Sequence, residues 1–367
     1  MDNITHSLFG VTLARTPLGR AGRGTTAALL LASNAPDVDF AATAGGAAKY
    51  LEWHRGITHG PLGVIGLSLA SAGLVVLARR LNPKWRHDDD ASFAMLVAVS
   101  MIGVLFHVLM DLPTSYGIRL LSPFSWRWFS LDWMPIVDIY LLIVLASGLW
   151  FGRATEAAKR RNAVIVLTFV AIIYGVRAAA HRQALDLAPI LFGPTLPPRC
   201  DPPAGGEWLD SWPKPAPSLR PDGRRCLVEI AALPGFSSPF DWRIVAQMSN
   251  AFELHDINVL DQRYQGVTDA EVDSSHFWRQ SIRYPNIWTP VVAQAATTPV
   301  GSVFLGFSRF PAARTANDSS GTSTVRFTDV RFVSSAPADS RSPRSQLFTA
   351  TIRIDGQGRV TFQKLGP

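Results

Sequence analysis

Histidine and aspartate side chains recur through the first third of the sequence at positions that could hold a metal ion. Residues 54–59 carry two histidines and an arginine, immediately before a long apolar stretch. His107 and Asp111 are four residues apart in another apolar stretch, so a helix would place both on one face. The residues of metal-ligand type are His6, Asp37, Asp39, His54, His59, His107 and Asp111. Imidazole and carboxylate are ligands of hydrolytic metal centres, and we predict one or two divalent ions here, with Zn²⁺ as the expected metal.

Each of these residues also has an explanation that involves no metal. A single histidine in an apolar helix is commonly a core residue, and His107 with Asp111 could be a hydrogen-bonded pair between helices. Asp37 and Asp39 follow a proline and could serve a turn and a helix N-cap. The segment around His6 could be an ordinary capping segment. Taken one at a time, these residues leave both explanations open.

Four apolar stretches are long enough, or nearly so, to be transmembrane helices. They cover residues 61–78, 92–112, 135–151 and 163–180. A helix needs about 20 apolar residues to cross a bilayer. We therefore predict an α-helical membrane domain with about four transmembrane helices.

The predicted spans place the candidate ligands on one side of the membrane. His54 and His59 precede the first span, His107 and Asp111 end the second, and Asp138 begins the third. An ionisable group at membrane depth costs at least ~2.5–3.5 kcal/mol on insertion scales, so the buried ones need a partner or a bound cation. This agreement between unrelated motifs favours the metal centre over the separate structural explanations.

Loop charge predicts the orientation of the spans. The loops at 79–91 and 153–162 each carry four Lys or Arg residues, whereas the loop at 113–134 carries two. By the positive-inside rule the first and third loops are cytoplasmic, and the metal motifs and the C-terminal half are periplasmic. Two features oppose this orientation: the acidic residues 88–90 and the cations of the N-terminal segment, Arg15, Arg20, Arg23, Lys49 and Arg55.

The composition changes near residue 190. Residues 1–199 hold 18 Lys and Arg against 12 Asp and Glu, whereas the remaining residues hold 17 against 16. The basic excess belongs to the membrane part, which indicates loops beside anionic lipid and argues against a nucleic-acid partner. We divide the chain into a multi-span membrane domain (1–188), a proline-rich linker (189–222) and a β-rich soluble domain (223–367).

Short strand-like runs define the C-terminal part. They include residues 226–232, 243–248, 303–307, 325–333 and 347–354. The two cysteines, Cys200 and Cys226, could form one disulfide if this part faces an oxidising compartment. The sequence identifies no protein partner for this domain.

Several linked motifs resemble those of a known family, the YdjM-type membrane-bound metal-dependent hydrolases of bacterial inner membranes. The motifs are residues 1–7, 36–39, 54–59, 107–117 and 132–138. The resemblance covers roughly residues 1–180 and departs at Gly60, where the family usually has serine. The family is distantly similar to zinc-dependent phospholipase C and P1-type nucleases, which implies phosphoester hydrolysis.

The function that we predict is metal-dependent hydrolysis of a phosphoester or ester in a lipid-like, amphiphilic substrate at the membrane. A metal-activated water would attack, Asp39 or Asp111 could act as general base, and Arg55 could stabilise the developing oxyanion. Arg55 could instead be a lipid anchor. The alternative is a non-enzymatic membrane metal-binding sensor or scaffold. Seven candidate ligands are too many for one closed structural ion, which favours two ions or an open site.

Overall fold

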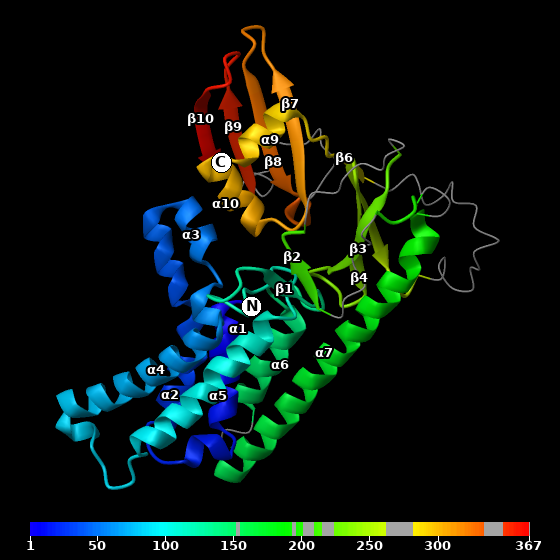
Figure 1. The fold of residues 1–367 in the computed structure, drawn as a ribbon. Helices are drawn as coiled ribbons and strands as arrows, with labels where there is room; N and C mark the ends of the chain where they lie inside the picture. Colours follow the sequence, from blue (N-terminus) through cyan, green and yellow to red (C-terminus); the bar gives the residue numbers. More distant parts are fainter. Residues whose placement is uncertain are drawn as a thin grey trace. The chain divides into compact units, whose positions relative to one another are not determined.

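The computed structural model describes residues 1–151, 155–192, 196–200, 209–214, 224–261, 282–333 and 348–366. The chain divides into two compact units, which we describe separately (Figure 1). The first consists of Met1–Ala41, Trp53–Ala179 and Phe236–Pro239, and the second of Ala42–Glu52, Ala180–Gly235 and Phe240–Pro367.

The first unit is built from three helical hairpins. Their helices are α1 (Asn3–Ala14) with α2 (Thr25–Ala32), α4 (Pro61–Leu81) with α5 (Phe93–Asp111), and α6 (Ile139–Trp150) with α7 (Glu156–Phe192). Short 3₁₀ segments lie between them: η1 (Pro17–Arg20), η2 (Ala35–Gly45), η3 (Ile57–His59) and η4 (Pro83–Trp85). In Figure 1, α1, α4 and α6 run away from the end where the N-terminus lies, and α2, α5 and α7 return toward it.

Small residues let α2 pack closely between its neighbours. A Cβ atom added to Gly103 of α5 would lie 2.8 Å from Cβ of Ala32, and one added to Gly10 of α1 would lie 2.7 Å from Oγ of Ser33. Glycine at both positions therefore brings the end of α2 against α1 and α5. This contact also fixes the position of the residues that come after α2 in the chain, including Asp37.

Three helices of the first unit, α4, α5 and α7, are long and apolar enough to cross a membrane, judged by length and composition. The third predicted span is observed as α6, which has only 12 residues and is therefore about 18 Å long. The fourth is longer than predicted, because α7 runs from Glu156 to Phe192 and enters the predicted linker. The membrane part thus has three to four apolar helices.

The two ends of the hairpins differ in charge. At the end away from the N-terminus, Arg15 donates to the carbonyl oxygens of Gly148 and Leu149 at 3.1 and 3.0 Å, and Arg20 lies 3.8 Å from Glu156. The backbone N–H of Arg23 donates to the carbonyl of Asp89 at 2.9 Å. The arginines Arg15, Arg20 and Arg23 therefore lie at the same end as the basic loop between α4 and α5. We call this the basic end. Three of the five N-terminal cations that opposed the predicted orientation therefore lie on the side that this orientation requires, whereas Arg55 contacts Asp111 at the other end of α5.

Asp138 joins α6 to α7. One of its carboxylate oxygens accepts the backbone N–H of Leu141 at 2.9 Å, which caps α6, and the other lies 2.5 Å from the guanidinium of Arg177. Both side chains are fully buried. The negative charge of the buried Asp138 carboxylate is therefore balanced by Arg177, and Asp138 does not require a metal ion.

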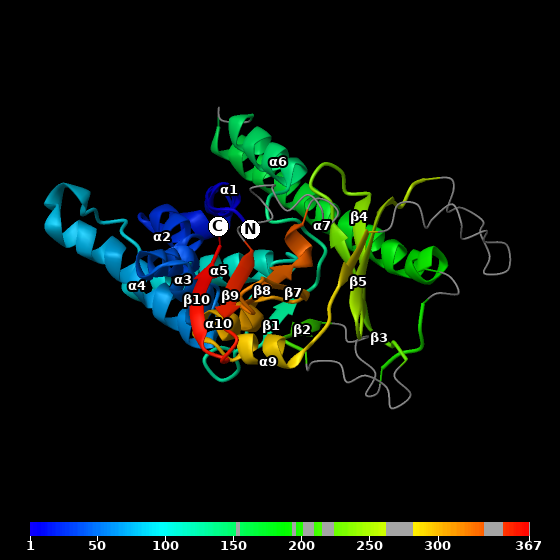
Figure 2. The same cartoon turned by 90° about the horizontal axis from the view of Figure 1, so that it is seen from above.

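The second unit is β-rich, as the sequence predicts, and contains two four-stranded antiparallel sheets (Figure 2). The first sheet has the order β3 (Leu227–Pro234), β4 (Asp241–Met248), β5 (Ala251–Asn258), β6 (Ile282–Pro285). The second has the order β10 (Val360–Leu365), β9 (Thr349–Ile354), β8 (Ser323–Asp329), β7 (Pro311–Asn317). Cys200 and Cys226 form a disulfide in this unit.

One predicted strand is wrong. Residues 303–307 belong to the helix α10 (Pro299–Phe307), which follows α9 (Pro290–Ala296). Thr298 caps α10 by accepting the N–H of Gly301 at 3.1 Å, and Pro299 occupies its first turn. This Thr-Pro start is a helix signal that outweighs the short apolar run.

Replacing Arg177 with methionine tests the Asp138 pair. The substitution leaves a buried carboxylate without its cation, so we expect a loss of about 3–5 kcal/mol in the free energy of unfolding. Arg182→Met on the same helix is the control, because Arg182 pairs with Asp186 on an exposed surface, where ion pairs contribute about 0–1 kcal/mol. Denaturant unfolding in detergent measures both, and equal losses would contradict this role of the pair.

Candidate metal centre

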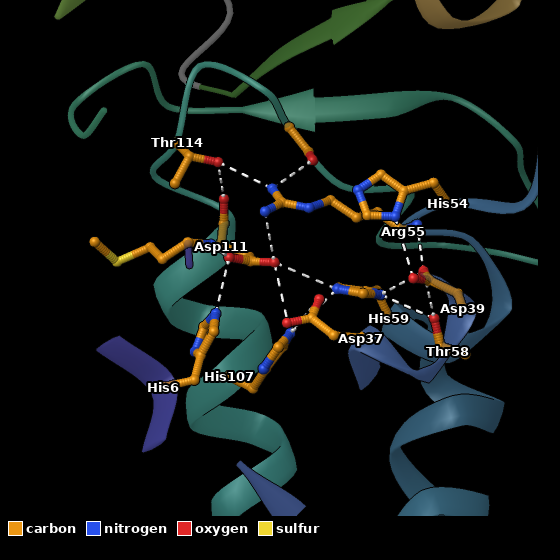
Figure 3. A network of polar contacts seen from close by, with 12 residues as sticks. His6, Asp37, Asp39, His54, Arg55, Thr58, His59, His107, Asp111 and Thr114 are labelled. Carbon is orange, nitrogen blue, oxygen red and sulfur yellow. Dashed lines mark hydrogen bonds and ion pairs between the residues drawn. The ribbon is translucent and has the colours of Figure 1, made fainter. Parts of the chain in front are cut away.

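Four side chains converge at the end of the hairpins opposite the basic end. One ligand atom from each of Asp37, His59, His107 and Asp111 lies within 4.8 Å of those of the other three (Figure 3). The two Nε2 atoms of His59 and His107 are 3.3 Å apart. Oδ2 of Asp111 lies 3.3 Å from Nε2 of His59 and 3.6 Å from Nε2 of His107, and Oδ1 of Asp37 lies 3.6 Å from the latter. We call these four residues the cluster.

The cluster residues come from three different elements. His107 and Asp111 occupy the last two turns of α5, Asp37 lies in η2, and His59 ends η3 just before α4. The chain turns after His59 at Gly60, where an added Cβ would lie 2.0 Å from the carbonyl oxygen of Ser122. This close approach explains why the residue after the second histidine is glycine here, where the resembling family usually has serine.

Hydrogen bonds fix the orientation of both cluster histidines. Nδ1 of His107 lies 2.8 Å from the carbonyl oxygen of Ser33, which can only accept, so Nδ1 carries the proton and Nε2 presents a lone pair to the cluster. Nδ1 of His59 lies 3.0 Å from Oγ1 of Thr58, whose hydroxyl donates to Asp39 at 3.1 Å. Such outer partners are characteristic of metal-ligating histidines.

Asp111 is the most heavily contacted member of the cluster. Its Oδ2 lies 3.1 Å from a guanidinium nitrogen of Arg55, and its Oδ1 lies 3.3 Å from Nε2 of His6 and contacts the amino group of Met1. The His6 ring stacks on His107 with ring centroids 3.8 Å apart. His6 therefore lies against the cluster without being one of its four members.

Arg55 is held by several contacts. Its backbone has a φ of 50°, which is uncommon for a residue other than glycine. The N–H of Arg55 donates to Asp39 at 2.6 Å, and its side chain donates to Oγ1 of Thr114 and the carbonyl of Gly117, both at 3.1 Å. These contacts direct the guanidinium onto Asp111. A buried arginine held in this way is not the headgroup anchor that the sequence left open.

Asp39 and His54 form a pair beside the cluster. Nδ1 of His54 lies 3.1 Å from Oδ1 of Asp39, and Oδ2 of the same carboxylate accepts from Thr58 and from the backbone of Arg55. Of the seven predicted ligands, the structure thus brings four together, places His6 in contact with Asp111, and places Asp39 and His54 outside the cluster, where they support it.

Burial sets the protonation of the groups outside the spans. It lowers the pKa of His59 and His6 well below the ordinary value, and the neighbouring His107 adds to the effect. Burial also lowers the pKa of His54, although its hydrogen bond to Asp39 acts in the opposite direction, and raises the pKa of Asp37, although the attraction of Arg55 acts in the opposite direction. These imidazoles are therefore neutral at pH 7, which is the form that binds metal.

The cluster fits a divalent ion by its donors and by its spacing. Among the described residues, Oδ2 of Asp37 and Nδ1 of His6 are buried and have no hydrogen-bond partner, and the two oxygens of Asp111 and Nε2 of His6 have ion-pair contacts without hydrogen-bond geometry. Two ligands at about 2.0–2.1 Å from a tetrahedral zinc ion lie about 3.3–3.4 Å apart, close to the 3.3–3.6 Å between neighbouring ligand atoms here. The group could therefore hold a metal ion. The described part of the chain contains no second such group, and His276 lies outside it.

Sequence reasoning missed the residues that orient the ligands. Thr58 lies inside the 54–59 motif, and its hydroxyl next to His59 was the available signal. The carbonyl of Ser33 left no signal, because any residue there would offer the same backbone oxygen. The same holds for the carbonyl of Gly117 that binds Arg55.

The fold and the cluster define a class of protein: a helical membrane protein with a buried His/Asp group at one end of its helices. Residues 1–184 match the YdjM inner membrane protein family, and the chain belongs to this family. All four cluster residues lie in the matched region. The resemblance to the YdjM family is thereby confirmed, and the family description names the membrane but no reaction.

Another similar protein is known from Bacillus subtilis (strain 168), where it is described as the uncharacterized protein YfhP. It is 24% identical over 212 residues, which cover 53% of this chain and 62% of YfhP. No solved structure matches the chain.

Alanine substitutions test which histidines bind metal. We expect His59→Ala and His107→Ala to lose most of the bound zinc, because each removes a nitrogen from the cluster. His54→Ala should keep most of it, because His54 lies outside the cluster. His87→Ala, at an exposed position of the basic end, is the control. Elemental analysis of protein purified in detergent gives the stoichiometry, and zinc loss in His54→Ala equal to that in His107→Ala would show that the ligand set is larger.

Proposed function

We propose that this protein is a metal-dependent hydrolase of the inner membrane that cleaves a phosphoester or ester bond in an amphiphilic, lipid-like substrate. The observation that carries the proposal is the buried cluster of ligand atoms with the guanidinium of Arg55 held 3.1 Å from Asp111 inside it. Arg55 thus adds a fixed positive charge beside the ligand atoms, where the charge of a substrate would be met.

The cluster residues Asp37, His59, His107 and Asp111 would hold the ion, and the mixed nitrogen and oxygen donors suit Zn²⁺. When bound, such an ion supplies Lewis acidity and lowers the pKa of a water ligand toward about 7. The protein contributes ligand orientation through Ser33, Thr58 and Asp39, as described above.

Arg55 would act on the charge of the substrate. It cannot ligate a metal, because its guanidinium stays protonated and has no lone pair. With neutral histidines, the two cluster carboxylates balance one divalent ion, and Arg55 places a fixed positive charge beside Asp111. This guanidinium favours an anionic group such as a phosphoester, because its planar shape matches the phosphate oxygens.

The catalytic aspartates predicted from the sequence divide into two roles in this proposal. Asp111 serves as a ligand, because its oxygens face Arg55 and three imidazoles. Asp39 acts as a positioning residue, because it accepts hydrogen bonds from Thr58 and from the backbone of Arg55 and pairs with His54. Asp37 lies at the edge of the cluster with 10% of its side chain exposed, which makes it the carboxylate best placed to face a substrate.

Exposed apolar side chains beside the cluster support an amphiphilic substrate. Val38, between Asp37 and Asp39, is 58% exposed, and Phe124 and Trp126 on the loop before β1 (Trp128–Ser130) are 78% and 42% exposed. Aromatic residues of this kind occur at membrane interfaces. Exposed apolar side chains on these segments, together with the Arg55 cation, suit a molecule with an acyl chain and an anionic head.

A second candidate function is favoured by the size of the cluster. Four protein ligands are the number that closes a structural zinc site, and the seven predicted candidates no longer argue against one. The competing proposal is therefore a membrane sensor or scaffold with a closed metal site. The two proposals differ in whether Arg55 affects a reaction.

The orientation that we propose places the cluster on the periplasmic side. The basic end would face the cytoplasm by the positive-inside rule, and the cluster lies at the other end of α4 and α5. The second unit follows α7, which starts at the basic end and passes Asp138 at the cluster end. The disulfide between Cys200 and Cys226 supports an oxidising compartment for this unit.

Cysteine labelling tests the orientation. In intact spheroplasts, a membrane-impermeant maleimide should label Ser320→Cys in the exposed β7–β8 turn and should leave Asp89→Cys at the basic end unlabelled. The native cysteines serve as an internal reference, because a disulfide does not react before reduction. The reverse pattern would place the cluster in the cytoplasm.

Arg55→Lys separates the enzyme from the sensor. Lysine keeps the charge but cannot reproduce the fork on Asp111, Thr114 and an oxyanion, so we expect metal content to survive and turnover to fall by on the order of 10²-fold. The readout is zinc content and hydrolysis of phosphomonoester, phosphodiester and ester probes by one preparation.

Arg119→Lys is the matched control, because Arg119 is also buried but its guanidinium lies over the rings of Trp126 and Trp128. We expect this variant to keep its turnover. Full metal with full activity in Arg55→Lys would refute the role of Arg55. A wild-type protein that hydrolyses none of the probes would favour the sensor.

A further inference from the structure

A cleft opens at the basic end of the first unit, far along α7 from the cluster. It has a volume of about 630 Å³ and is lined by residues of η1 and of the first turns of α7. The start of α7 is its lower end in Figure 1. Its lining includes Arg20, Glu156, Arg160, Arg161, Val164 and Ile165. Neither the metal site nor the proposed hydrolysis uses these residues.

The lining of the cleft is cationic near the start of α7 and apolar about one turn further along the helix. Arg160 and Val164 are four residues apart on α7, as are Arg161 and Ile165, so each guanidinium stem lies about one turn below an apolar side chain on the same face. Val164 and Ile165 are 56% and 45% exposed, and they belong to a helix long and apolar enough to cross the membrane. The change from cationic to apolar side chains therefore runs along the axis of α7.

Arg20 adds a third guanidinium from another element. It lies 3.8 Å from Glu156, and the same glutamate accepts from Lys159 at 2.6 Å. The lining therefore holds three arginines against one carboxylate, and that carboxylate already contacts two cations. The cleft retains a net positive charge that can bind an anion.

We infer that this cleft binds an anionic phospholipid of the leaflet at the basic end. The headgroup phosphate would contact Arg20, Arg160 and Arg161, because guanidinium groups bind phosphate oxygens in bidentate geometry. An acyl chain would lie along Val164 and Ile165. Basic pockets beside transmembrane helices on the cytoplasmic side are suited to anionic headgroups. The apolar upper half of the cleft distinguishes a lipid from a free phosphate, which would gain nothing from Val164 and Ile165.

Native mass spectrometry of the full-length protein in detergent tests this site. We titrate the protein with phosphatidylglycerol and, in parallel, with zwitterionic phosphatidylcholine. The wild type should retain one phosphatidylglycerol with clear preference over phosphatidylcholine, and Arg160→Gln/Arg161→Gln should weaken that binding on the order of tenfold. Glycerophosphoglycerol, which carries the headgroup without acyl chains, should compete poorly.

The matched control is Arg80→Gln/Lys84→Gln, which removes two cations from exposed positions of the same end outside the cleft. It should bind phosphatidylglycerol like the wild type. Equal weakening in both double variants would show diffuse attraction to the basic end and would overturn the site. Strong competition by glycerophosphoglycerol would show a site for a soluble phosphate compound. Zinc content serves as the folding check, because the cluster lies at the opposite end of the helices.

Discussion

The burial of the Asp111 carboxylate at the end of an apolar helix is the constraint on which the first unit depends. A charged carboxylate with no partner is costly in such surroundings, and Asp111 is fully buried. Several elements place a side chain against it: the segment before η3 supplies the positive charge of Arg55, and α1 and η3 supply the imidazoles of His6 and His59. The close packing of α2 at Gly10 and Gly103 then brings Asp37 and the carbonyl of Ser33 to the same place. The hairpins are thus arranged around one negative charge.

A second buried carboxylate in the same unit, that of Asp138, is stabilised in the usual way, by an ion pair. Asp138 forms an ion pair with Arg177 of α7 and also caps α6, so its charge is balanced by a single arginine. Asp111 also contacts an arginine, but it faces three imidazoles in addition, and two of them, His59 and His107, direct a lone pair rather than a proton toward it. Neutral imidazole nitrogens next to a carboxylate repel it unless a cation lies between them. This difference between Asp138 and Asp111 supports a metal ion at Asp111.

The sequence predicted the parts of this arrangement that depend on spacing along the chain. The four-residue spacing of His107 and Asp111 fixes their common face on α5, and the motif at 54–59 necessarily lies at the start of the α4 span. It could not predict contacts between segments far apart, such as the pairing of Asp39 with His54 or of Asp138 with Arg177. The lengths of α6 and α7 could not be predicted either, because hydropathy identifies apolar stretches but does not show where a helix ends. The strand predicted at residues 303–307 is wrong for a related reason, because a five-residue apolar run fits a strand or a helix equally well.

The two oxygens of Asp111 decide how many ions the site suits. Oδ2 faces His59 and His107, which with Asp37 complete a group of four ligand atoms, whereas Oδ1 faces His6 as its single imidazole. A second ion at Oδ1 would have one carboxylate oxygen and one histidine from the side chains of the described residues, too few to be held by the protein. The stacking of His6 on His107 at 3.8 Å instead holds the His107 ring in place from its far side. The geometry therefore favours one ion on the Oδ2 side of Asp111, with His6 as a positioning residue for its ligands.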